Sequence, residues 1–511
     1  MPERAVWRLA LAAEAPHGSA RAPRPVVARI RVESDGVAPV DRSVTVRPNA
    51  PWQSLELDLS QFAGRASRLE LRASRPEGMD PEEPHDVRLA VASPRLERTA
   101  PLRPAAAPRV RHVVMVVLRG ARIDRFLPTI SPRFTGGLAM MAREGVVAEA
   151  IAGSFNAWAA TQTATTGLSA DRHGVREHTD LLSEEAPTPA TVFAEHGIAS
   201  VAYSDDAVWI GSGADRGYNR REGCPEAQPL CRVAPMFQAV ADSMTPRRGP
   251  SFTLVVTRAG TIPLDPPNDL VLALDPVPYE GTLTPAQTGV LAARTRYGEL
   301  RLDARDRARL DLLYDAALLQ VDRGLGVVIE RLQNLRLDDS TLLLVVGDRG
   351  TALAAGRHLG DGPMSRREVA STVLLARGPG LPRGATLRGV TGTLDAVATA
   401  LDAFGVAPPS EFEGVSLYDS DRLAERALPF VANARADLGL RFGAWIALPR
   451  PPPTQGMSLY SAAGDPLGVD DVGDAHPIAR GFAEGVISLV RGDASRRSFA
   501  RSTRVLTAPA R

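Results

Sequence analysis

The chain has 511 residues, a length that corresponds to roughly three domains of about 150 residues each. Hydrophobic residues make up 44% of it and charged residues 23%, a globular balance that excludes a disordered or collagen-like chain. Sixty basic and 59 acidic residues leave a formal net charge of +1, so no overall field attracts nucleic acid or anionic membranes.

Residues 1–105 alternate apolar and polar positions in short runs. An alternation of this kind is typical of strands with one buried face, and five such runs at short spacing predict an antiparallel β-sandwich. The runs lie at 26–34, 43–48, 54–60, 68–74 and 87–94. The segment around Trp52 resembles the jelly-roll, carbohydrate-binding modules of secreted enzymes, so Trp52 is either a platform for a sugar or a packed core side chain.

The extreme N-terminus shows no export signal. Its apolar run between Arg8 and Glu14 is too short for the apolar region of a signal peptide. No other stretch approaches the roughly 18–20 apolar residues that span a bilayer, so we predict no transmembrane segment. The compartment stays open on this basis.

Residues 106–425 alternate apolar strand-like runs with helical patterns. Strand-like runs lie at 113–118, 253–256 and 342–346, and the first is continuously apolar, which is typical of a buried parallel strand. A long helix is predicted over 304–335. This pattern predicts an α/β fold with a largely parallel sheet, whose functional residues follow the carboxyl ends of the strands.

The last region, residues 426–511, changes pattern again. Short strands are predicted within 429–450 and one amphipathic helix over 477–492, together a small α+β subdomain. Cys224 and Cys231 share one loop, where they form either a local disulfide or two free thiols. No residue of the chain is lysine, so no lysine amine can serve as a base or bind an anion.

Several segments of the middle region, in order, resemble the sulfatases of the alkaline-phosphatase-like superfamily. The resemblance covers about residues 110–490 and rests on six segments, given by their residues: VVMVVLRGARIDRF, the segment ending TTGLSADRHGV, the helix with YDAALLQVDRG, STLLLVVGDRG, VASTVLLARGPG with GVTGTLDAVATALDAFGV, and SLYSAAGDP. It implies an alkaline-phosphatase-like fold, a divalent cation held by carboxylates, and a nucleophile made from Cys or Ser.

The positions that match the family's metal ligands and nucleophile hold other residues. The first ligand turn reads Leu118-Arg119-Gly120, which puts a guanidinium where the family has a carboxylate. Counting back from Thr166-Gly167, the nucleophile position falls on Ala157, which has no nucleophilic group. Thr161 is one of the nearest hydroxyls that a shifted alignment would promote.

The second ligand pair keeps only half of the family's pattern. Asp348 retains its carboxylate, whereas Arg349 replaces a ligand, and one carboxylate does not make a site for a cation that takes 6–8 oxygens. We predict that Asp348 pairs with Arg119 or Arg349, so that two arginines take the place of the metal. His358, ten residues further on, either approaches this pocket or is a loop histidine.

These departures predict a catalytically inactive, sulfatase-like protein with a binding or scaffolding role and no cofactor. Its expected binding pocket contains Arg119, Arg349, Thr161 and His358, with Asp348 as the remnant of the metal site. The expected partner is an anionic small molecule, a sulfated or phosphorylated glycan, or a protein, because arginine binds oxyanions with two hydrogen bonds. The alternative is an active sulfuric or phosphoric ester hydrolase with an atypical site and one Ca²⁺ or Mg²⁺ ion. The resemblance alone implies an extracytoplasmic location.

Overall fold

The structure is a computed structural model that divides into two compact units. The first unit consists of 1–103, 456–459 and 471–488, and the second of 104–455, 460–470 and 489–511. Within these spans the described residues are 1–2, 4–15, 24–80, 86–98, 110–223, 232–245, 249–275, 279, 281, 283–296, 302–353, 359–360, 362, 364–465, 467–493 and 500–501. Cys224, Cys231 and His358 lie outside the described residues. The division into 1–105, 106–425 and 426–511 stays a prediction.

The first unit contains two three-stranded antiparallel sheets, with strand orders β4-β1-β6 and β3-β2-β5. Side chains from β1, β2, β3 and β4 share one hydrophobic core, as the alternating buried positions require. The strands are β1 (Ala5–Glu14), β2 (Val26–Ser34), β3 (Val37–Val46), β4 (Gln53–Asp58), β5 (Arg68–Ser74) and β6 (Arg88–Arg98). Trp52 is 54% exposed, so it is not a core side chain.

Strand β1 is absent from the predicted runs, although it is the middle strand of its sheet. The short apolar run beside Arg8 belongs to it, and its side chains alternate between the core and the surface. Helix α12 (Pro477–Gly492) has the predicted bounds. Its residues through Ser488 belong to the first unit, where the Asp35 carboxylate accepts hydrogen bonds from the Ile478 and Ala479 amides at 3.2 and 2.8 Å.

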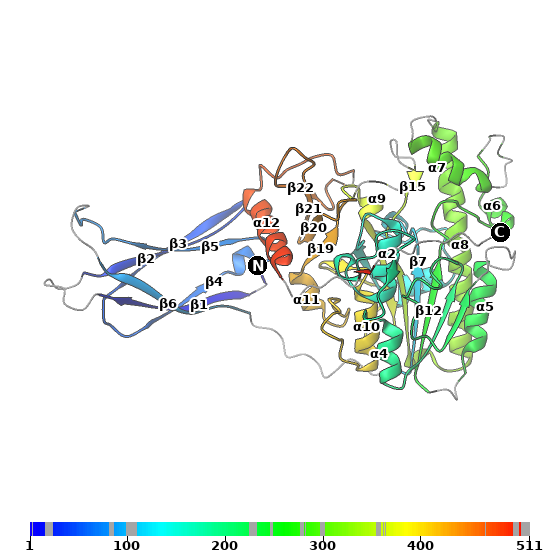
Figure 1. Cartoon of the computed structure of the whole chain (residues 1–511), viewed down its shortest axis with the longest axis horizontal. Helices are drawn as coiled ribbons and strands as arrows, with labels where there is room; N and C mark the ends of the chain where they lie inside the picture. Colours follow the sequence, from blue (N-terminus) through cyan, green and yellow to red (C-terminus); the bar gives the residue numbers. More distant parts are fainter. Residues whose placement is uncertain are drawn as a thin grey trace. The chain divides into compact units, whose positions relative to one another are not determined.

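The second unit contains a central sheet in the order β11-β10-β12-β7-β13-β16-β8-β17 (Figure 1). The five neighbouring strands β11, β10, β12, β7 and β13 are parallel to one another. Strand β16 runs antiparallel to both of its neighbours, β13 and β8. These strands are β7 (His112–Leu118), β8 (Val146–Ile151), β10 (Ala199–Ser204), β11 (Arg220–Gly223), β12 (Ser251–Thr257), β13 (Thr341–Gly347), β16 (Ser371–Arg377) and β17 (Ala385–Thr386). The predicted α/β class with a largely parallel sheet is therefore confirmed.

Helices cover both faces of this sheet (Figure 1). One face packs against α1 (Gly137–Glu144), α5 (Val233–Ser243) and the 31-residue α8 (Ala304–Asn334). The other packs against α2 (Ala157–Thr166), α4 (Pro189–Glu195) and α10 (Asp395–Phe404). Burial on both faces explains why β7 and β13 are apolar at nearly every position.

A small antiparallel sheet of β19 (Ala427–Val431), β20 (Leu438–Phe442) and β21 (Trp445–Pro449) lies in the same unit. The loop before α2 is tied to β19, because the Phe155 amide donates to the Val431 carbonyl at 2.9 Å and the Val431 amide donates to the Gly153 carbonyl at 3.0 Å. Among the described helices, none is both long enough and apolar enough to cross a membrane.

Candidate functional site

The register of the central sheet brings the predicted site residues to one edge. Leu118, the last residue of β7, lies opposite Thr257 of β12 and Gly347 of β13. The residues that follow these strands, including Arg119 and Asp348, are therefore neighbours at the carboxyl end of the sheet. This is where the strand pattern places a functional site in an open α/β sheet.

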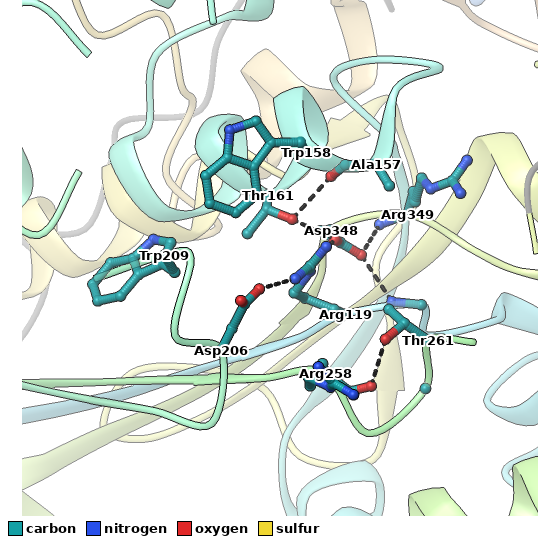
Figure 2. A network of polar contacts seen from close by, with 12 residues as sticks. Arg119, Ala157, Trp158, Thr161, Asp206, Trp209, Arg258, Thr261, Asp348 and Arg349 are labelled. Atoms are coloured by element: carbon teal, nitrogen blue, oxygen red, sulfur yellow. Dashed lines mark hydrogen bonds and ion pairs between the residues drawn. The ribbon is translucent and has the colours of Figure 1, made fainter. Parts of the chain in front are cut away.

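Asp348 is the centre of the hydrogen-bond network at this edge (Figure 2). Its carboxylate is 1% exposed and accepts from four donors. The donors are Arg119 Nε at 3.4 Å, the Gly120 amide at 2.8 Å, Thr161 Oγ1 at 2.8 Å and the Arg349 amide at 2.6 Å. Both carboxylate oxygens thus accept hydrogen bonds from the protein itself.

Arg119 bridges two carboxylates. Its Nη1 donates to Asp206, which follows β10 by two residues, while its Nε faces Asp348. The guanidinium carbon also lies 5.9 Å from the ring centroid of Trp158, within range of a cation–π contact. Arg119 is 7% exposed and Asp206 is 6% exposed, so this is a buried ion-pair triad rather than a surface pair.

Arg349 departs from the predicted arrangement. Only its backbone amide reaches Asp348, while its Nη1 donates to the Phe155 carbonyl at 3.1 Å. Figure 2 shows the Arg349 guanidinium directed away from Asp348. The Asp348 carboxylate already accepts hydrogen bonds from the side chains of Arg119 and Thr161. The Phe155 carbonyl, just before helix α2, gives the Arg349 guanidinium a different acceptor. One arginine, not two, therefore sits between the carboxylates.

Helix α2 presents Thr161 to the site and leaves an alanine at the position matched to the family's nucleophile. Asn156 caps the helix, since its side chain accepts from the Trp158 and Ala159 amides at 2.9 and 3.1 Å. Ala157 is the first helical residue and offers only a methyl group. Thr161 is fully buried, and its hydroxyl lies within hydrogen-bond distance of Asp348 and, at 2.9 Å, of the Ala157 carbonyl. It acts as a hydrogen-bond donor to the network.

The donor set does not fit a divalent cation. A cation here would share Asp206 and Asp348 with the Arg119 guanidinium, whose charge already faces both carboxylates. Calcium takes six to eight oxygen ligands and magnesium six, and two carboxylates engaged with an arginine do not supply them. Within the described ranges, no group of three or more His, Cys, Asp or Glu side chains is placed to hold a metal. The residues present and the metal that the fold family implies are in disagreement.

Asp206 and its neighbour Asp205 were not among the predicted site residues. Both follow β10, a strand of the same parallel sheet, so a search after every strand would find them. From the sequence, we considered only the residues that follow the three most apolar runs. Strand β10 is less apolar and contains Ser and Tyr, so Asp205 and Asp206 were not predicted. His178 is a further residue near the site, and its ring centroid lies 4.8 Å from that of Trp158, with the two rings tilted by 35°. Burial, and then the charge of Arg119, lower the pKa of His178.

The carboxyl of Asp205 gives the site a pH dependence. Burial raises its pKa to about 6, although the Thr257 hydroxyl and the Arg258 amide donate to it at 2.7 and 2.9 Å. Because the pKa is higher in the folded than in the unfolded chain, this group's stabilising contribution is present below about pH 4 and lost as pH rises through about 6.

We expect the Asp205→Asn variant to lack this loss. Between pH 4 and pH 8 the wild type should lose about 3 kcal/mol of unfolding free energy relative to the variant, since each pKa unit is worth about 1.4 kcal/mol. Urea titrations of both proteins across that range measure the difference. Parallel pH profiles for the two proteins would contradict it.

His173, in α3 (Ala170–His173), gives a pH dependence of stability opposite to that of Asp205. It is fully buried, and burial lowers its pKa to about 4. Its Nδ1 accepts from the Val175 amide at 3.1 Å, so the neutral ring carries its proton on Nε2, which lies 3.2 Å from the Ala159 carbonyl. The role of His173 is to fix the turn beneath α2 in its neutral form.

Acid should therefore destabilise the wild type through His173. Its contribution is complete above about pH 6.5 and falls by about 3 kcal/mol as pH drops through about 4, because the unfolded chain takes up the proton first. We expect the His173→Gln variant to be less stable at pH 7, with a difference from wild type that shrinks towards pH 4. Thermal unfolding at half-unit pH steps tests this, and a difference that stays constant would refute it.

Comparison with known proteins places these observations in a family. A family model described as Sulfatase matches residues 112–406 of this chain. No curated protein matches the chain.

Solved structures of similar fold include three with informative descriptions. The phosphonate monoester hydrolase of Agrobacterium radiobacter has a TM-score of 0.59 at 16% identity, over 75% of this chain and 95% of that one. A protein in complex with its substrate D-glucosamine-2-N,6-O-disulfate has a TM-score of 0.60 at 13% identity, over 76% and 99%. A third, in complex with κ-ι-κ-neocarrahexaose, has a TM-score of 0.57 at 14% identity, over 76% and 94%. At these identities the likeness concerns the fold alone.

Proposed function

The chain belongs to the sulfatase family, and on that premise we propose that it binds a carbohydrate without hydrolysing it. The observation that carries the proposal is the Arg119 guanidinium between Asp206 and Asp348. Ester hydrolysis in this fold needs a nucleophile beside a cation that polarises the ester. Here Ala157 has the position matched to the nucleophile, and a fixed protein cation lies between the carboxylates.

The binding half of the proposal rests on the carbohydrate ligands of proteins with this fold. One solved relative is bound to a sulfated glucosamine and another to neocarrahexaose. Arg119 itself is buried and its guanidinium already faces two carboxylates, so an anionic ligand would have to be bound by other side chains.

The test is hydrolysis of p-nitrophenyl sulfate and p-nitrophenyl phosphate with Ca²⁺, Mg²⁺, Mn²⁺ or Zn²⁺ added. The Asp348→Ala protein serves as the control for contaminating activity. We expect the wild type to give no turnover above this control. Turnover that Asp348→Ala abolishes would instead establish an active ester hydrolase with an atypical site, and the proposal would be abandoned.

A further inference from the structure

A cavity at the amino-terminal edge of the central sheet has no part in the site around Asp348. It is lined by the first residues of β7, β10 and β12, which are His112, Ala199 and Ser251, whereas Arg119 follows the opposite end of β7. Its volume is ≈ 340 Å³, within the range of small-molecule sites, and all of its described lining residues belong to the second unit.

The floor of the cavity is one face of the sheet at this edge. The register of the three strands sets neighbouring side chains in two rows, and all six residues line the cavity. These are Ala199, Ser251 and His112 in one row, and Val201, Thr253 and Val114 in the next. Alternate residues of a strand point to the same face of a sheet, so these side chains project from the face that α5 and α8 cover.

The walls come from the carboxyl-terminal ends of α5 and α8. Met244 directly follows α5, Leu332 lies in the last turn of α8, and Leu337 follows that helix. These residues lie over the same face of the sheet, because they pack with Val114 in one hydrophobic cluster. The floor side chains therefore point into the cavity, with the ends of two helices above them.

The surroundings of a ligand here are mainly apolar and uncharged. Most of the described lining residues are apolar, and none of them is acidic or an arginine. Burial, and then the charge of Arg111, lower the pKa of His112, so its ring is neutral at pH 7. A charged ligand would lose its hydration without meeting an opposite charge. The cavity therefore favours an uncharged molecule.

Two polar groups on the floor lack hydrogen-bond partners in the described part of the chain. Thr253 is 7% exposed, and no described residue pairs with its hydroxyl. His112 is also 7% exposed, and its Nδ1 lies 2.8 Å from Ser251 Oγ, whereas no described residue pairs with its Nε2. A buried polar group without a partner is unfavourable, so a ligand that supplies a hydrogen bond is favoured.

We propose that this cavity binds a small, mainly apolar alcohol or phenol, whose hydroxyl group forms a hydrogen bond with Thr253. A hydroxyl both donates and accepts, so it can pair with the Thr253 hydroxyl in either direction. The apolar part of the ligand packs on Val114 and Val201 and against Leu332 and Leu337. The inference goes beyond the proposed carbohydrate binding and does not depend on it.

The experiment uses the full chain and three probes of similar shape, p-cresol, toluene and 4-methylbenzoate. Saturation-transfer NMR titrations at pH 7 measure the dissociation constant of each. We expect p-cresol to bind about fivefold more tightly than toluene, which is the net effect of one hydrogen bond. 4-Methylbenzoate should bind at least about thirtyfold more weakly than p-cresol, because its carboxylate meets no opposite charge.

The variant Thr253→Val keeps the shape of the side chain and removes the hydroxyl. It should weaken p-cresol binding about fivefold and leave toluene binding unchanged, a split that a purely structural role of Thr253 would not give. Ala199→Trp fills the cavity from an exposed position and should abolish the binding of both probes. The matched controls are Thr386→Val on β17 and Ala194→Trp on α4, exposed residues outside the cavity, which should change neither affinity.

Several results would each overturn the proposal. They are no binding of p-cresol, equal affinities for p-cresol and toluene, tighter binding of 4-methylbenzoate, and p-cresol binding that Thr253→Val or Ala199→Trp leaves unchanged. Ester turnover bears on the proposed function alone, so the two failures are distinguishable.

Discussion

Replacing Arg119 with alanine should lower the unfolding free energy of the second unit by about 3–5 kcal/mol. The substitution leaves Asp206 and Asp348 buried without their shared cation, and breaking a buried ion pair on one side costs about that amount. It also removes the cation over Trp158. Guanidinium denaturation followed by tryptophan fluorescence measures the loss.

Arg143→Ala is the matched control, because Arg143 is exposed on α1 and should change stability by no more than about 0.5 kcal/mol. A double variant, Arg119→Ala with Asp348→Asn, should lose less than the sum of the two single changes, since the second change removes one of the orphaned charges. Additive losses, or an Arg119→Ala effect as small as the control's, would show that the triad does not stabilise the site.

Replacing Gly120 with alanine should be as damaging, through the backbone. Gly120 has φ +75°, and a Cβ there would lie 2.3 Å from the Gly260 carbonyl oxygen and 2.6 Å from Thr351 Oγ1. Its amide is one of the four donors to Asp348, so any shift that relieves the clash loses that hydrogen bond. We expect a loss above about 3 kcal/mol, or failure to fold, in the same denaturation experiment.

Gly211 offers the matched control. It has φ +86° in the same unit, and nothing lies within 4 Å of a Cβ added there. Gly211→Ala should therefore show the left-handed strain alone, about 1–2 kcal/mol. If both alanine variants lose the same amount, close approach at the site does not set the cost of Gly120→Ala.

Most of the fold of the second unit could be predicted because its strands are buried on both faces. The continuous apolar runs of β7 and β13 and the pattern of α8 mark their elements clearly. Strand β1 of the first unit was harder to predict, since it has few polar residues and its alanines are compatible with either a strand or a helix. The family resemblance then supplied the order of the segments, and the family model that matches 112–406 confirms the family.

The site could be predicted only in part. Arg119 and Asp348 meet because strand register places the ends of β7 and β13 together, whereas Thr161 reaches Asp348 from helix α2. The partner Asp206 comes from a strand two positions away in the sheet, so its contact with Arg119 depends on tertiary packing. The direction of the Arg349 side chain depends equally on a carbonyl supplied by another loop.

The most direct test of the central claim, that Arg119 serves as the fixed cation of this site, is a calorimetric titration of the wild type with Ca²⁺ and Mg²⁺. We predict no saturable binding that involves Asp348, and no rise in melting temperature at millimolar ion, because ligand binding to the folded state would raise it. One-to-one binding that is lost in the Asp348→Asn variant would contradict this claim, since Asp348 would then be a metal ligand despite Arg119.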